Sequence, residues 1–337
     1  MGRGGPRVAE AVNEAVLRPG LSRILDRLCC PRCRTADGAP EIALAEASSA
    51  LTCARCGSRY PVVSGVPDLR DAPGPGAESA LDRRAVDFYE RVYAEGCYGR
   101  DEQNEHIAPL SGWLAGVPED AFVLELGPGR GALQDVHPGY VGSDLSIESL
   151  VTRLRQPAFA SNAQNLPLQS GSVDFLFSVA VLEHIPDPAA ALAEIARVIS
   201  PGGRAYLAPA WNCRTWAAEG LNVRPYRDLS PTQRLRKATI PVRNSVLWRG
   251  AFAIPKRIAR RALWQARRRP TRFRFRRLDA NFEVFWASDS DATAQLDPHE
   301  TGLYFESRGW TVESPPSVSG RVFHRAQPLV VRRSLNS

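Results

Sequence analysis

The sequence lacks the features that mark membrane-spanning, secreted and repetitive proteins. No apolar run in its 337 residues reaches the ~20 residues that a helix needs to cross a bilayer. The first six residues have no apolar stretch of the kind found in secretory signal peptides, and Pro6 is incompatible with a myristoylation site. No internal repeat or low-complexity tract is evident. We therefore expect a cytoplasmic protein, with peripheral contact at the inner membrane face as an alternative discussed below.

The composition sets the scale of the fold. Hydrophobic residues make up 44% and charged residues 23% of the chain, which is ordinary for a globular protein. The length suffices for one sizeable α/β core with smaller appendages. The formal net charge is +7, and much of it is carried by one segment between residues 249 and 277.

Cysteines are few, but four of the seven form two C-x-x-C pairs, Cys30 with Cys33 and Cys53 with Cys56. This spacing is typical of a zinc ribbon, because each pair puts two thiolates on one side of a tight turn. A reducing compartment disfavours a disulfide framework. Arginines beside the pairs leave nucleic-acid contact open as an alternative role. The remaining cysteines are expected not to bind metal: Cys29, Cys97 and Cys213.

A glycine-rich turn is the most informative feature. Residues 123–131 read Val-Leu-Glu-Leu-Gly-Pro-Gly-Arg-Gly, so an apolar strand delivers Glu125 into a turn with glycines at Gly127, Gly129 and Gly131. A second short strand ends on Asp144, about where a ribose-binding acid follows the first βα turn. The pattern predicts a nucleoside-containing cofactor. A dinucleotide site remains open, since Gly127-x-Gly129-x-x-Ala132 also fits that fingerprint, and so does a turn without a ligand.

Four further blocks narrow the choice: Asn-Ala-Gln-Asn-Leu-Pro-Leu from Asn162, an apolar strand over 172–180, Val-Leu-Glu-His-Ile-Pro over 181–186, and Pro-Gly-Gly over 201–203. Together with the glycine turn they resemble the class I S-adenosylmethionine-dependent methyltransferases of the type 11 subgroup. The resemblance covers residues 121–210. It implies a Rossmann-like α/β fold whose sheet is mostly parallel with an antiparallel last strand, and S-adenosylmethionine as the cofactor.

The resemblance also assigns cofactor contacts. Glu125 and the three glycines would face the methionine and ribose portion, and Asp144 would hold the ribose hydroxyls. The adenine would lie against Leu145 and meet Asn162 and Ala163. The methionine end would be lined by Ser178 and Ala180. Asn162 stands where the family usually has an acid, and the segment 131–140 leaves room for a first helix of about one turn.

The N-terminal part suggests a second module. Residues 60–69 resemble the end of the small Trm112-like zinc domain, so we expect this ribbon over 26–70. A helical or flexible segment (1–25) precedes it, and a Pro/Gly-rich linker (71–79) separates it from the methyltransferase domain (80–337). A helix over 80–94 opens that domain, and its aromatic residues either cap the cofactor pocket or pack on the sheet.

A basic insertion is expected over about 211–298. Within 246–266, helical spacing predicts an amphipathic helix, kinked or split at Pro255. Its apolar face is Leu247, Ala251, Ile254, Ile258 and Ala262, widened by Trp248, Phe252, Ala259 and Leu263. Lys and Arg side chains lie opposite. Three interpretations stay open: a plain lid over the active site, contact with an anionic membrane, or contact with RNA phosphates. Beyond it we expect a helix introduced by residues 289–299, then two closing strands over 309–313 and 321–331.

Methyl transfer from a sulfonium needs alignment and water exclusion more than a fixed catalytic motif. If a hydroxyl is the acceptor, a general base helps. His184 is the best-placed candidate and His299 a weaker one, although a helix-entry or cofactor-side role for His184 is favoured over that of a base. We expect a methyltransferase for a small-molecule or glycan/lipid-linked acceptor, modified at oxygen or nitrogen. The alternatives are an RNA methyltransferase using ribbon and insertion to bind substrate, and a non-catalytic cofactor-binding module.

Overall fold

A computed structural model describes residues 17–34, 41–47, 49–70, 80–95, 104–284, 286, 289–323 and 327–335. Cys97 and the expected linker over 71–79 lie outside these ranges. No helix in the described ranges is long and apolar enough to cross a membrane.

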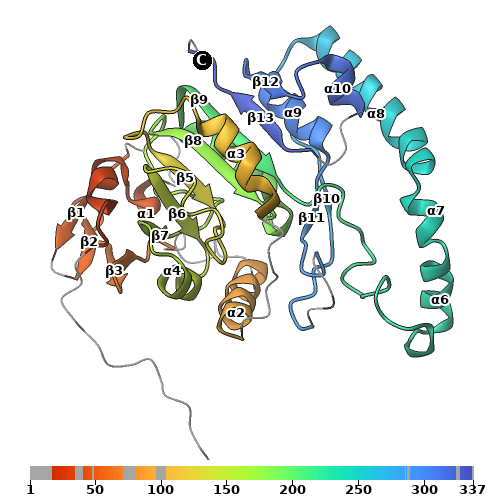
Figure 1. Cartoon of the computed structure of the whole chain (residues 1–337), viewed down its shortest axis with the longest axis horizontal. Helices are drawn as coiled ribbons and strands as arrows, with labels where there is room; N and C mark the ends of the chain where they lie inside the picture. The colour runs from red at the N-terminus through yellow and green to blue at the C-terminus, as the bar shows by residue number, and fades with distance from the viewer. Residues whose placement is uncertain are drawn as a thin grey trace, which may run out of the picture.

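The centre of the molecule is a seven-stranded sheet with the order β12-β13-β9-β8-β5-β6-β7 (Figure 1). Neighbouring strands from β7 to β9 pair in parallel, and β13 runs antiparallel to both β9 and β12. The expected mostly parallel sheet with an antiparallel last strand is therefore confirmed. The strands are β5 (Val123–Leu126), β6 (Tyr140–Asp144), β7 (Ala158–Ala160), β8 (Val173–Val179), β9 (Ile199–Ala208), β12 (Thr311–Ser314) and β13 (Leu329–Arg332).

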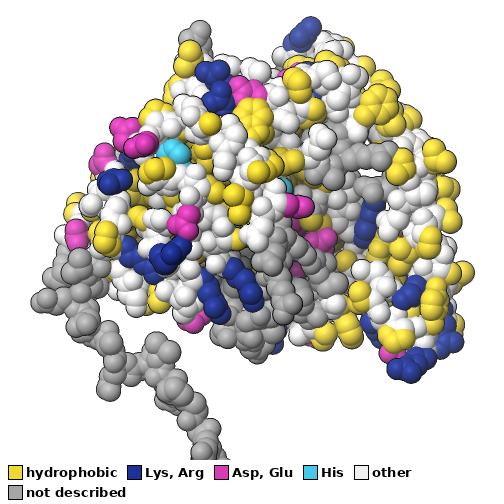
Figure 2. Space-filling model, viewed as in Figure 1, with side chains coloured by type: hydrophobic (Ala, Val, Ile, Leu, Met, Phe, Trp, Pro, Cys, Tyr) yellow, Lys and Arg dark blue, Asp and Glu magenta, His cyan; other side chains and the backbone are white. Residues whose placement is uncertain are grey.

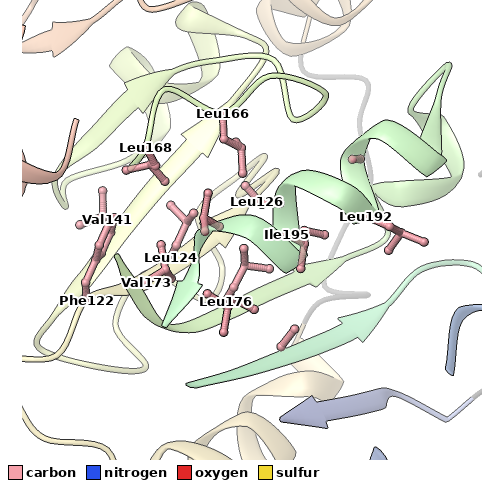
Figure 3. Close-up of a cluster of buried hydrophobic side chains, with 14 of the residues drawn as sticks. Phe122, Leu124, Leu126, Val141, Leu166, Leu168, Val173, Leu176, Leu192 and Ile195 are labelled. Carbon is pink, nitrogen blue, oxygen red and sulfur yellow. The ribbon is translucent and has the colours of Figure 1, made fainter. Parts of the chain in front are cut away.

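Helices cover both faces of this sheet, which is why its central strands β5 and β8 are mostly apolar and almost entirely buried. On one face α5 (Pro188–Val198) packs Leu192 and Ile195 onto Leu124 and Leu176 (Figure 3). The sequence starts α5 sharply: Asp187 accepts hydrogen bonds from the backbone of Ala189 and Ala190, and a proline follows it at the first helical position. The other face carries α3 (Ile107–Leu114), preceded by η2 (Asn104–His106), and α4 (Ile147–Arg153).

The N-terminal region forms a separate four-stranded antiparallel sheet in the order β1-β2-β3-β4. Its elements are η1 (Leu21–Arg27), α1 (Pro31–Arg34), β1 (Leu44–Ala47), β2 (Ala50–Cys53), β3 (Arg59–Val63) and β4 (Val66–Pro67). This region shares a continuous apolar core with the large sheet, since Leu51 and Tyr60 belong to the same buried cluster as Phe122. The backbone joins them too, because Leu69 donates to the carbonyl of Ala160 at 2.8 Å.

Between β9 and α9 (Pro298–Glu306) the chain makes a long excursion, the expected insertion. It contains η4 (Tyr226–Asp228), α6 (Pro231–Ala238), α7 (Ile240–Asn244) and α8 (Val246–Arg267), and returns through the short pair β10 (Arg276–Arg277) and β11 (Ala294–Gln295). Helices α6, α7 and α8 follow one another along one side of the molecule as an arm (Figure 1).

Two helix predictions need correction. Pro255 does not split α8, which runs unbroken through it. The hydrogen bond that proline cannot donate would reach the carbonyl of Ala251, and both residues are exposed, so water can satisfy that carbonyl. The predicted one-turn helix between Gly131 and Tyr140 is absent from this described segment. Four-residue turns replace it, with the backbone N–H of Gln134 donating to the carbonyl of Gly131 and that of Val136 to Leu133.

The C-terminal prediction is also corrected. The strand expected over 321–331 is only β13, and the residues before it form α10 (Val318–Phe323). Ser317 begins this helix, because its side-chain oxygen accepts from the backbone of Gly320 at 2.9 Å. Likewise α9 begins only at Pro298, where Asp297 caps it by accepting from His299. The residues 289–297 before it are not helical.

Candidate cofactor site and cysteine cluster

The carboxyl ends of β5, β6, β7 and β8 meet at one edge of the large sheet. Their register aligns Leu126 with Ser143 and Ser178, and Asp144 with Ala160. The ends of these strands and the loops that leave them carry the ten predicted cofactor residues. In open α/β sheets, ligands bind in the crevice at this edge.

The glycine turn is built from left-handed backbone. Gly127, Gly129 and Gly131 have φ of 71°, 51° and 74°. A Cβ on Gly127 would lie 2.3 Å from Cγ2 of Val181, so the side chain of Val181, in the loop after β8, packs directly on the bare backbone of the turn. Because its three glycines have no Cβ, the turn leaves main chain that a ligand can approach closely.

Asp144 ends β6 inside this turn. Its Oδ2 accepts from the backbone N–H of Gly129 at 3.2 Å, and its Oδ1 accepts from Ser146 at 2.9 Å. Burial raises the pKa of Asp144 to about 6, although these N–H donors oppose the shift. The carboxylate therefore also holds the glycine turn in shape.

Two buried polar atoms at the strand ends lack hydrogen-bond partners among the described residues: Oε1 of Glu125 and Oγ of Ser178. The other oxygen of Glu125 accepts from the hydroxyl of Tyr140. Burial raises the pKa of Glu125 to about 8. Leaving a buried polar group unpaired costs about 1–3 kcal/mol, so both atoms fit a site that a polar ligand completes.

Helix α2 (Ala80–Glu95) covers this edge. Phe88 contacts Phe282 of the insertion, with ring centroids 5.4 Å apart, and both pack with Leu145. Glu90 accepts from the Ser146 hydroxyl at 2.8 Å and from the backbone of Ile147 and Glu148 at the start of α4. The predicted helix is thus present, and these contacts are with the loops at the sheet's edge.

Glu90 is tied in turn to the N-terminal region. Arg70 pairs with Glu90 at 2.9 Å and donates to the carbonyl of Leu145 at 2.9 Å. Asp68, two residues earlier, holds the same guanidinium at 2.7 Å. The segment that leaves the small sheet therefore positions both α2 and the loop after Asp144.

The loop after β7 is closed on itself. The side-chain oxygen of Asn162 accepts from both the backbone and the side chain of Gln164, at 2.9 and 3.1 Å. Ala163 is half-buried against the apolar core. In this arrangement the carboxamide of Asn162 shapes its own turn.

The loop after β8 brings together charged groups that lie far apart in the sequence. Ala180 is exposed with a left-handed φ of 54°, and η3 (Leu182–His184) follows it. Nδ1 of His184 lies 3.2 Å from Oδ2 of Asp291, and its Nε2 lies 3.8 Å from Oε1 of Glu183. Tyr89 of α2 donates its hydroxyl to Asp291 at 2.9 Å.

This environment determines the protonation of His184. Burial alone would lower its pKa, but the charge of Asp291 and the hydrogen bond to it, with Glu183 and Asp289 nearby, raise the pKa to about 10. The imidazole is therefore protonated at neutral pH. His299, the weaker candidate, is buried in α9, and burial lowers its pKa to about 4.

Several residues at this site escaped prediction from the sequence. Asp291 lies 107 positions beyond His184 and within the insertion, where an acid before a helix signals only a cap. Glu90 lies on the helix over 80–94, for which the sequence predicted a role only for the aromatic residues, Tyr89 among them. Their roles depend on tertiary contacts that no local motif records.

The four predicted zinc ligands lie together in the N-terminal region. All four sulfurs are within 4.8 Å of one another, with Cys30 3.6 Å from Cys56 and Cys33 3.7 Å from Cys53. A zinc–sulfur bond of about 2.3 Å implies a tetrahedron edge of ~3.8 Å, so the cluster has the dimensions of such a site. Gly57 completes the second turn with a φ of 70°. The buried Cys29 and Cys213 are not in this cluster.

One segment of the chain is similar to a known family. Residues 124–207, 84 of the 337 residues, match the model described as a methyltransferase domain. It spans the glycine turn, Asp144 and the loop of His184.

Two relatives are similar to part of the chain. The chain is 30% identical over 162 residues to the tRNA (carboxymethyluridine(34)-5-O)-methyltransferase ALKBH8 of Macaca fascicularis, covering 45% of this chain and 24% of that protein. It is 42% identical over 123 residues to the uncharacterized methyltransferase Rv3342 of Mycobacterium tuberculosis, covering 32% and 49%. The chain spans less than half the length of these relatives.

Among solved structures, the chain is similar to CalS10, an amino pentose methyltransferase from Micromonospora echinaspora. The identity is 24%, the coverage 36% of this chain and 56% of that chain, and the TM-score 0.30.

Proposed function

We propose that this protein is an S-adenosylmethionine-dependent methyltransferase. The observation that carries the proposal is the methyltransferase domain over 124–207, whose left-handed glycine turn and Asp144 converge at the carboxyl edge of the sheet. The unpaired Glu125 Oε1 and Ser178 Oγ support a polar ligand there. When bound, the cofactor supplies a methyl group on a positively charged sulfur. Because the sulfur already carries this charge, the thioether needs no further activation as a leaving group.

The chain's residues then bind and orient the cofactor, and they exclude water. In this proposal Asp144 holds the ribose hydroxyls, while Leu145, Asn162 and Ala163 border the adenine. Glu125, the three glycines, Ser178 and Ala180 face the remainder. The cover formed by Phe88 and Phe282 keeps water from this edge. His184 acts as a fixed cation that joins the end of β8 to the insertion, because its raised pKa leaves no lone pair for a proton at neutral pH.

For the acceptor we propose a small molecule or a glycan/lipid-linked group, methylated at oxygen or nitrogen. Two segments close over the site, α2 and the strand region around Asp291, and they are linked by the hydrogen bond from Tyr89 to Asp291. A covered site of this kind suits a small acceptor group better than a folded polymer.

RNA is the second candidate. It is favoured by the similarity to the tRNA methyltransferase and by the basic insertion. In that case the four-cysteine region and the insertion would both contact the nucleic acid. Phosphate contacts would make binding strongly salt-dependent.

We also propose a structural zinc ion held by Cys30, Cys33, Cys53 and Cys56 in a Trm112-like ribbon. The sulfur separations support it, and so does the small size of the region, which metal binding would stabilise.

Methyl-transfer assays separate the acceptors. The chain would be incubated with S-adenosylmethionine labelled in its methyl group and with two pools, a small-molecule and lipid extract and purified tRNA. Label in the first pool is expected. Label confined to tRNA would favour the second candidate, and label in neither, from protein that binds the cofactor, would point to a binding module.

A further inference from the structure

Helix α8 has its charged side turned inward. Arg257 and Arg261 are only 7% and 6% exposed. Arg257 pairs with Asp297 at 2.9 Å, and Arg261 pairs with Glu306 at 2.7 Å. Between them, Arg260 pairs with Glu300 at 3.2 Å. Ion pairs to the region of α9 therefore fix which side of α8 faces the protein.

The apolar side of α8 consequently faces solvent. Trp248 and Phe252 are 49% and 55% exposed, and their rings contact each other with centroids 5.0 Å apart. The strip continues along α8 and onto α6 and α7. We call it the outer arm surface, defined by the exposed residues Leu235, Val242, Val246, Leu247, Trp248, Phe252, Ile258 and Leu263. Figure 2 shows hydrophobic side chains gathered along this side of the molecule, over the arm.

The arm's own sequence carries charge of one sign, although acids from outside it pair with Arg236, Arg257, Arg260 and Arg261. Of the fifty residues 229–278, sixteen are Lys or Arg and none is Asp or Glu. At 100° per residue, Lys256 and Arg267 fall on the edge of the apolar strip of α8. Both are exposed, and so are Arg268, Arg269 and Arg272 just beyond the helix. An exposed apolar strip edged by cations matches the border between acyl chains and negatively charged headgroups.

We propose that the outer arm surface docks the protein on an anionic lipid membrane. The strip would enter the headgroup boundary with Trp248 and Phe252 leading, while Lys256 and Arg267 contact lipid phosphates. RNA is the weaker occupant, because buried ion pairs engage Arg257 and Arg261 and the centre of the surface is apolar. The proposal is independent of the methyltransferase activity. Because the same insertion carries Phe282 and Asp291, docking would hold the site near the membrane surface.

Vesicle co-sedimentation tests this proposal with the full chain. The vesicles contain phosphatidylcholine alone or with phosphatidylglycerol, at low and moderate salt. We expect at least about tenfold stronger binding to the anionic vesicles, since each cation near such a surface contributes roughly 1 kcal/mol. Trp248→Glu with Phe252→Glu should abolish binding, and Lys256→Glu with Arg267→Glu should reduce it to the level seen with phosphatidylcholine.

The matched control is Val63→Glu with Leu335→Glu, which adds the same charge at two exposed apolar positions outside the arm. It should bind as the parent protein does. Thermal unfolding and S-adenosylhomocysteine binding, measured on every variant, show that each is folded and separate this proposal from the proposed activity.

The proposal would be overturned by no binding to anionic vesicles, by equal binding to both vesicle compositions, or by loss of binding in the control variant. It would also be overturned by tRNA binding that the aromatic substitutions leave unchanged. A dimer that dissociates on Trp248→Glu with Phe252→Glu would also overturn it, since the surface would then be covered by a second copy.

Discussion

Nδ1 of His184 lies 3.2 Å from Oδ2 of Asp291, and this buried pair joins the loop after β8 to the turn that precedes β11 in the insertion. The hydroxyl of Tyr89 reaches the same carboxylate from α2 at 2.9 Å. Three segments that are distant in sequence thus meet on one charge pair. This contact, as well as packing, closes the edge of the sheet at which the carboxyl ends of β5, β6, β7 and β8 meet.

The pair makes stability depend on pH. The pKa of His184 is raised from 6.5 to about 10, so its contribution is fully present below pH 6.5 and is lost as the pH rises through about 10. The pKa of Asp291 is lowered by His184 although burial opposes this, so its contribution is lost only in acid, below pH 3.8. We predict that His184→Gln costs about 3–5 kcal/mol at pH 6.

Thermal unfolding from pH 6 to 10.5 measures this. The gap in Tm between the parent and His184→Gln should narrow as the pH rises. His106→Gln is the control, because burial lowers the pKa of His106. The difference in Tm between the parent and His106→Gln should therefore not narrow as the pH rises. A constant gap for His184→Gln would show that the imidazole is neutral.

Glu90, which lies on α2, should stabilise the same edge of the sheet. It accepts from the hydroxyl of Ser146 and from two N–H groups of α4 and pairs with Arg70, so Glu90→Gln weakens four charge-assisted contacts. We predict a loss of about 1.5–3 kcal/mol in unfolding free energy and weaker S-adenosylhomocysteine binding. Asp87→Asn, exposed on the same helix, should change neither. Equal effects in both variants would indicate a general loss of helix α2.

Metal analysis of the purified chain should find one zinc. Cys53→Ser should release it, while Cys213→Ala, which removes a buried thiol outside the cluster, should retain it. Because Cys53 shares a buried cluster with Phe122, we expect the Tm of the whole chain to fall with the zinc, in a single transition. Full zinc in Cys53→Ser would show that the ligand set is wrong.

The sequence predicted those parts of the fold that local patterns determine. The buried run of β8 and the glycine turn each carry their own backbone signal, and the bounds of α8 followed from its helical spacing. The continuity of α8 through Pro255 and the helix over residues 318–323 were harder to predict. A proline at an exposed position interrupts no buried hydrogen bond, and Ser317 began a helix where apolar residues suggested a strand.

The residues of the candidate site also fall into those that a local pattern predicts and those that depend on tertiary contacts. Asp144 and the glycines could be proposed from the sequence because the turn itself requires them. Asp291 and Glu90 were missed because their partners come from tertiary packing. The orientation of α8 was not predicted either, since a helical wheel gives two faces and only the acids near α9 decide that the arginine side is buried.

Calorimetric titration of the purified chain with S-adenosylhomocysteine, and separately with NAD, tests the central claim most directly. The account predicts one S-adenosylhomocysteine per chain, no heat from NAD, and binding weakened by about 1.5–3 kcal/mol in Asp144→Asn. Asp135→Asn, an exposed acid paired with Arg155, should bind as the parent does. Saturable binding of NAD with none of S-adenosylhomocysteine would contradict the account.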